Sequence, residues 1–176
     1  MFSGRERHSS SRYLNWGYPQ RIIRNRDFLY ILNLKPERWP AGAPQRLVPG
    51  TKDETYPMYG IDEKGVHHSD RAFTDIDACP TKSFIIENYR DPAIRYFFDL
   101  AHAKRPRVEF FDIRKDADCL HNLAGKRTFE RGEREMREAL MAELRASKDP
   151  RVVGPDREVF DSYIRYSPMR EFPRPE

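Results

Sequence analysis

The chain has 176 residues, enough for one domain with a real hydrophobic core. Hydrophobic types make up 38% of the residues, charged types 34%, and 14 prolines interrupt the chain, so we expect a thin core and long irregular stretches. The net charge of +4 would suit a nucleic acid, a membrane surface or a sulfated glycan, since all three carry dense negative charge. Basic and acidic residues alternate along most of the chain, as at positions 131–135, which is typical of a solvated helix face rather than a binding patch.

The sequence has no obvious targeting or membrane segment. No apolar run approaches the roughly 20 residues needed to cross a bilayer, and the first residues lack the apolar stretch of a signal peptide. As written, the chain is therefore expected in the cytoplasm and away from membranes. Cys79 and Cys119 have no CxxC partner, so neither a zinc site nor a disulfide framework is indicated. We interpret both as buried thiols, which would allow one disulfide if the protein is exported.

The first half of the chain alternates between irregular and regular segments. Residues 1–19 show no hydrophobic period, and a domain does not usually begin this way. Gln20 to Leu34 predicts a hairpin, because two runs of β-branched and aromatic residues flank a turn rich in Asn and Asp. Prolines and glycines recur from Lys35 to about Asp77, so little regular structure is expected there. Cys79-Pro80 and Asp91-Pro92 then predict the starts of two short helices, since proline is favoured at the first helical position.

The second half predicts one strand and one long helix. Val108–Ile113 has the composition of a short strand. Thr128 to Ser147 is expected to form an amphipathic helix. Its apolar stripe consists of Phe129, Met136, Leu140 and Leu144. From Asp149 onward, recurring prolines predict an extended arm over the surface. The expected fold class is α+β, with a small antiparallel sheet (the hairpin at about 20–34 plus the strand at about 108–113) packed on the C-terminal helix.

Two stretches resemble a known family. The first runs from Gly4 to Tyr13 (GRERHSSSRY) and continues from Gly17 to Arg24 (GYPQRIIR). It is similar to the segment by which sulfatases of the heparan N-sulfatase type enter their C-terminal subdomain. The second runs from Glu109 to Asp116 (EFFDIRKD), with Asn122–Ala124 beyond it, and is similar to the E-L-Y-D-L-x-x-D-P-x-E-x-x-N-L-A run near the end of many sulfatases. Ala117 stands where that run usually has proline, a departure that lies in a turn.

The resemblance implies that the chain is the C-terminal part of a sulfatase. Residues 1–19 would lead from a catalytic α/β domain absent here, 20–147 would form the C-terminal subdomain docked on it, and 148–176 the arm. The parent enzyme would be exported or periplasmic and would hydrolyse sulfate esters or sulfamates of sulfated sugars, with a formylglycine and a calcium ion.

The resemblance also places four residues close to the substrate cleft. They are Arg5, Glu6, Arg7 and His8, and we take them as candidate substrate-binding residues. Arginine and histidine can contact a sulfate or a sugar through charge-assisted hydrogen bonds. The alternative is a solvated linker with ordinary charges.

The catalytic machinery of that family is not recognisable in this sequence. Formylglycine forms in a C-x-P-S-R motif, whereas the nearest stretch, Cys79–Ser83, has proline one place early and serine where arginine is needed. Asp75-Ile76-Asp77 and Asp116-Ala117-Asp118 offer paired carboxylates, for which we predict structural roles in turns. His67-His68 has no third ligand in sight and is predicted to be a pair of solvated loop residues. We therefore predict no catalytic residue, metal or cofactor in this chain, and no activity when it is alone.

A second class of function is a non-enzymatic basic module that binds nucleic acid or another anionic polymer. Arginine and aromatic side chains interleave in and before the hairpin, where they could stack on bases and pair with phosphates. The residues that would do so are Arg12, Tyr13, Arg21, Arg24, Arg26 and Tyr30. The resemblance favours the sulfatase interpretation over a nucleic-acid partner.

Overall fold

The computed structural model describes residues 1–166 and 168–175, so positions 167 and 176 of the predicted arm lie outside the described residues. The chain forms two compact units. Unit 1 consists of Met1–Glu6, Tyr18–Pro36 and Arg105–Tyr163, and unit 2 of Arg7–Gly17, Glu37–Lys104 and Ile164–Glu176. The units differ from the predicted division because the chain leaves unit 1 after the hairpin and returns to it before the last strand.

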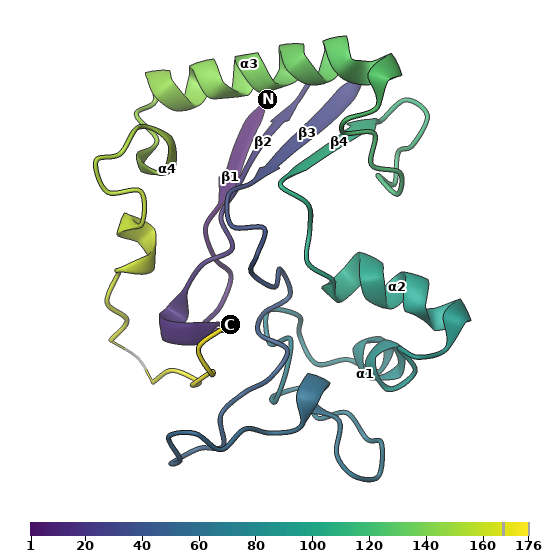
Figure 1. Ribbon diagram of the computed structural model, residues 1–176, viewed down its shortest axis with the longest axis vertical. Coiled ribbons are helices and arrows are strands. Elements are labelled where there is room, and N and C mark those ends of the chain that lie inside the picture. Colours follow the sequence, from purple (N-terminus) through teal and green to yellow (C-terminus); the bar gives the residue numbers. More distant parts are fainter. Residues whose placement is uncertain (167, 176) are drawn as a thin grey trace. The chain divides into compact units, whose positions relative to one another are not determined.

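Unit 1 is built on a four-stranded antiparallel sheet in the order β1-β2-β3-β4 (Figure 1). Its strands are β1 (Phe2–Arg5), β2 (Gln20–Arg24), β3 (Phe28–Asn33) and β4 (Val108–Asp112). The α+β class, the hairpin and the later strand are thus confirmed. Strand β1 was not predicted, and its four residues are all exposed. A strand without a buried face leaves no hydrophobic alternation in the sequence, and this one is placed by pairing with β2.

Helix α3 (Glu130–Ala146) lies across one face of the sheet (Figure 1). It is preceded by a short 3-10 turn, Arg127–Phe129, and therefore begins slightly later than the predicted Thr128. The predicted apolar stripe is confirmed at its three buried residues, Met136, Leu140 and Leu144. They pack in one core cluster with side chains from the sheet: Ile23, Tyr30, Leu32 and Phe110.

The outer edge of β4 is covered by the segment that follows it. The Asn122 side chain accepts a hydrogen bond from the Phe110 N–H at 2.9 Å and donates one to the Val108 carbonyl at 3.1 Å. The Leu123 N–H donates to the Phe110 carbonyl at 2.8 Å. These bonds satisfy backbone groups that an edge strand would otherwise expose. The Asn-Leu-Ala run of the second resembling stretch therefore has a structural role at this edge.

We expect Asn122→Ala to lower the free energy of unfolding by about 1–2 kcal/mol, because it leaves the Phe110 N–H and the Val108 carbonyl without these partners. Urea denaturation followed by far-ultraviolet circular dichroism measures the change. His121→Ala, at the exposed neighbouring residue, is the control and should stay within about 0.5 kcal/mol of the original protein. Equal losses in the two variants would contradict a specific role for the Asn122 side chain.

Unit 2 combines the two predicted helices with a long irregular segment. Helix α1 (Pro80–Glu87) and helix α2 (Pro92–His102) begin where the prolines predicted. The Cys79 thiol accepts a hydrogen bond from the Lys82 N–H at 3.4 Å, and Asp91 accepts one from the Ala93 N–H at 2.8 Å, so both helices are capped. The core is mainly aromatic and includes Trp39, Tyr59, Phe73, Tyr89 and Phe98.

The C-terminal arm is less extended than predicted. It contains helix α4 (Pro150–Val153) and a 3-10 turn at Val159–Asp161, both in unit 1. Asp149 caps α4 by accepting a hydrogen bond from the Arg151 N–H at 2.9 Å. Further along, in unit 2, Phe172 is buried. Among the described residues, the helices are all too short or too polar to cross a membrane.

Candidate functional site

The four candidate substrate-binding residues are divided between the two units. Arg5 ends β1 and Glu6 follows it in unit 1, whereas Arg7 and His8 belong to unit 2. Arg5 and His8 are exposed, and Glu6 and Arg7 are half-buried. The four residues therefore lie in two separate environments, one in each unit.

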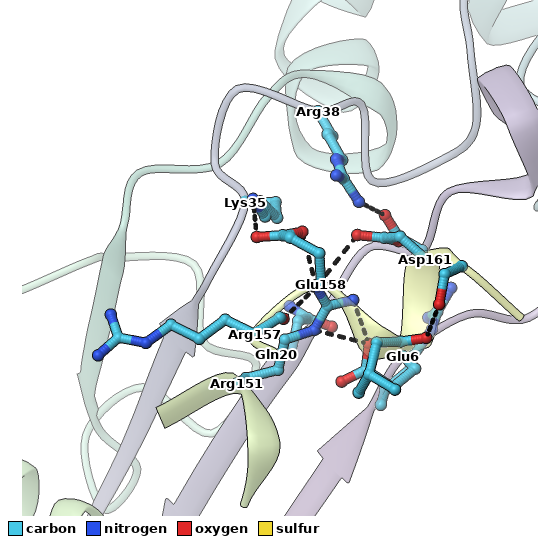
Figure 2. Close-up of polar contacts among 12 residues, drawn as sticks. Glu6, Gln20, Lys35, Arg38, Arg151, Arg157, Glu158 and Asp161 are labelled. Carbon is cyan, nitrogen blue, oxygen red and sulfur yellow. Dashed lines mark hydrogen bonds and ion pairs between the residues drawn. The ribbon is translucent and has the colours of Figure 1, made fainter. Parts of the chain in front are cut away.

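In unit 1, Glu6 is bound by two arginines. One carboxylate oxygen accepts a hydrogen bond from Arg21 Nη2 at 2.7 Å. The other accepts bonds from Arg151 Nη2 at 2.8 Å and Nε at 3.2 Å (Figure 2). Both oxygens of the carboxylate are thus engaged within the protein. This arrangement gives Glu6 a structural role.

Arg151 is the centre of this ionic cluster, and its side chain is only 2% exposed. Its Nη1 also donates to Glu158 at 3.0 Å and to Asp161 at 3.1 Å (Figure 2). Burial opposes the charge, but the hydrogen bonds to Glu6 and Asp161 outweigh it and raise the pKa of Arg151 above its ordinary value. We call this group the Arg151 cluster. Its members are Glu6, Arg21, Asp149, Arg151, Glu158 and Asp161.

In unit 2, the segment after His8 is fastened to Asp75. The Ser9 N–H and hydroxyl donate to one carboxylate oxygen of Asp75 at 3.0 and 2.8 Å, and Arg12 Nη2 donates to the other at 2.7 Å. We call Ser9, Arg12 and Asp75 the Asp75 clamp. Burial alone would raise the pKa of Asp75, but the Arg12 charge and the serine hydroxyls hold it below its ordinary value. Beside the clamp, His8 Nδ1 lies 3.2 Å from the Asp75 carbonyl oxygen.

These contacts confirm the structural roles predicted for two aspartates. Asp75 belongs to a buried ion pair, since both its side chain and that of Arg12 are almost inaccessible. Asp116 accepts hydrogen bonds from the Leu120 and His121 N–H groups at 3.0 and 2.8 Å, which holds a turn in place.

The prediction for the adjacent histidines is wrong at His67. Its side chain is buried, with the residue only 6% exposed, and Nδ1 lies 3.0 Å from the Ser83 hydroxyl. Its main-chain N–H donates to Glu87 at 2.9 Å, so the loop is fastened to α1 at two points. Burial, followed by the nearby charge of Lys82, lowers the pKa of His67 to about 4. His68 stays at the surface and pairs with Asp62 at 2.9 Å.

The prediction of two buried thiols is also wrong. Both cysteines are free, Cys79 is exposed and Cys119 is partly exposed. Cys79 is the N-cap of α1. The buried residue of this stretch is Lys82, whose Nζ donates to the carbonyls of Ser69 and Ile76 at 3.2 and 2.9 Å. Burial lowers the pKa of Lys82 to about 8.

Residues 1–166 and 168–175 contain no candidate metal site. No three side chains of His, Cys, Asp or Glu converge there in a way that could hold a metal ion.

Half of the residues proposed for nucleic-acid binding are buried. Arg12 lies in the Asp75 clamp, Arg21 in the Arg151 cluster and Tyr30 in the core of unit 1. Stacking on bases and pairing with phosphates both require access from solvent. Exposed positions remain at Arg24 and Arg26, with Tyr13 half-buried.

Comparisons with known proteins give no family assignment: no model of a protein family and no curated protein matches this chain.

Proposed function

We propose that this chain is the C-terminal part of a sulfatase of the heparan N-sulfatase type and that it acts by docking on a catalytic α/β domain. The supporting observation is that the two resembling stretches, far apart in sequence, belong to one sheet. Gly4 and Arg5 of the first stretch pair with Arg21 and Gln20 of its continuation. Residues 109–112 of the second stretch lie in β4 of the same sheet.

The proposed docking surface is the face of the sheet opposite α3. Because successive side chains of a strand point to opposite faces, Ile22, Leu29 and Ile31 lie on this face, away from the core residues that contact α3. All three are half-buried. An antiparallel sheet with one solvated face usually alternates apolar and polar residues, whereas β2 and β3 carry aliphatic residues on both faces. This pattern supports a second layer, which we propose is the catalytic domain.

In the proposed enzyme, hydrolysis belongs to the catalytic domain, which would supply the formylglycine and the calcium ion. Arg5, Arg7 and His8 remain the residues of this chain proposed to contact a sulfated sugar, by charge-assisted hydrogen bonds. Glu6 leaves this set because two arginines occupy its carboxylate.

We expect the purified chain alone to hydrolyse neither an aryl sulfate nor N-sulfoglucosamine in the presence of calcium. Mixed with the catalytic domain of such a sulfatase, prepared without its own C-terminal part, it should associate and restore hydrolysis. Analytical ultracentrifugation measures association, and sulfate release measures activity. Ile22→Arg should weaken association at least tenfold, since it places a charge in the proposed contact. Leu120→Arg, at an exposed site in the loop after β4, is the control and should leave association unchanged.

Three outcomes would contradict the proposal. Hydrolysis by the chain alone would require a catalytic site within it. Failure of the folded chain to associate with the folded catalytic domain would remove the docking role. Tight binding of single-stranded nucleic acid without such association would instead favour the second class of function.

A further inference from the structure

A pocket of about 340 Å³ lies beside the first turns of α3 and is lined by three arginines. Arg127 comes from the 3-10 turn before the helix, and Arg134 and Arg137 come from the helix itself. The remaining lining residues are Gly125, Glu130 and Glu133. We call this site the arginine pocket. It lies entirely within unit 1.

The side chains of the three arginines form no hydrogen bond or ion pair with residues 1–166 or 168–175. Arg137 acts on the buried Tyr30 only through its charge. Residues four positions apart face each other on a helix, so Arg137 would be expected to pair with Glu133. However, the Glu133 carboxylate accepts a hydrogen bond from the Gly125 N–H at 2.7 Å, so it is held toward the loop.

The neighbouring Arg131 differs from the three arginines of the pocket because it has a partner. It donates to Glu135 at 2.8 Å and is thus neutralised by its own helix. The run of alternating charge at 131–135 was predicted to be a solvated face, and this pair agrees with that prediction. The arginine pocket differs in two ways. Its arginines come from two elements and line one hollow, and the carboxylate of Glu133 is already bound to the main-chain N–H of Gly125.

We propose that the arginine pocket binds a sulfate or phosphate group of an anionic ligand. Each guanidinium presents a planar fork of N–H donors that matches the oxygens of such a group, and three of them line one pocket. Three cations face two carboxylates in the pocket, and the exposed Lys126 beside it adds positive charge. The inference stands apart from the docking role, since it uses none of the residues proposed to contact the catalytic domain.

Isothermal titration calorimetry of the whole chain tests the proposal with two probes. A heparin-derived tetrasaccharide carries sulfate groups, and inositol hexakisphosphate carries phosphate groups. We expect binding of at least one probe, weakened at least tenfold in the triple variant Arg127→Ala/Arg134→Ala/Arg137→Ala. The matched control, Arg90→Ala/Arg145→Ala/Arg157→Ala, removes three exposed arginines elsewhere and should bind as the original protein does.

The relative affinity of the two probes identifies the group that the pocket prefers. Equal weakening in the triple variant and its control would show general attraction to a basic surface and would overturn the proposal. Failure of the original protein to bind either probe at low ionic strength, where screening is weakest, would overturn it as well.

Discussion

Replacing Arg151 with methionine is expected to lower the free energy of unfolding by about 3–5 kcal/mol, the range found when one partner of a buried ion pair is removed. Methionine keeps much of the length of the side chain but none of its donors. Glu6 would keep its bond to Arg21, and Glu158 its bond to Lys35 at 2.7 Å. Asp161, whose side chain is only 7% exposed, would lose the hydrogen bond and charge that Arg151 supplies.

The matched control is Arg131→Met, the same change at an exposed ion pair on α3. This pair is exposed and screened by solvent, so its loss is expected to change stability little. Because Arg151 lies in unit 1, the measurement is hydrogen exchange of the amides of β2 and β3 in increasing urea. Similar losses in the two variants would show that burial adds nothing to the Arg151 ion pairs.

The parts of the fold that the sequence predicts are those with a local pattern. The hairpin is marked by its turn, where the Asn25 side chain accepts hydrogen bonds from the N–H groups of Asp27 and Phe28 at 2.8 and 2.7 Å. Helix α3 is marked by its apolar stripe, and the two helices of unit 2 by a capping residue and a proline. In each case the residues that fix the element lie within a few positions of one another.

The parts that the sequence does not predict depend on residues far apart in the chain. Glu6 and Arg151 are separated by 145 positions, and Arg12 and Asp75 by 63. Nothing local distinguishes these charges from the many solvated ones. His67 is a similar case, because its burial depends on how the loop folds against α1. Apart from Val66, the nearest residues are glycine, charged and polar types that are typical of an exposed turn.

These contacts explain what several residues of the first resembling stretch do in the fold. Its acidic residue, Glu6, joins the Arg151 cluster of unit 1, whereas Ser9 and Arg12 join the Asp75 clamp of unit 2. The stretch therefore anchors the chain in both units within a few residues. Arg5 precedes the anchor in unit 1, and Arg7 and His8 precede the anchor in unit 2.

Acidification is expected to destabilise unit 2 through His67. The unfolded histidine takes up a proton below about pH 6.5, whereas the buried one does so only near its pKa of about 4. A base with a lowered folded pKa contributes its full stability above pH 6.5 and loses it as the pH falls toward 4. The loss should reach about 2 kcal/mol at pH 5 and on the order of 3 kcal/mol at pH 4, at 1.36 kcal/mol for each pH unit.

Two charged groups near His67, Lys82 and Asp62, change little between pH 7 and 5. Lys82, with a pKa of about 8, stays charged, and Asp62, with a pKa of about 2, keeps its contribution until well below this range. Both tryptophans belong to unit 2, so their fluorescence in urea measures its free energy of unfolding. His67→Asn, which retains a group able to bond to Ser83, should flatten the pH dependence, whereas His121→Asn, at an exposed histidine, should keep it. If the original protein were equally stable at pH 7 and pH 5, His67 would be able to take up a proton in the folded state. The loop would then open around His67 at little cost in free energy.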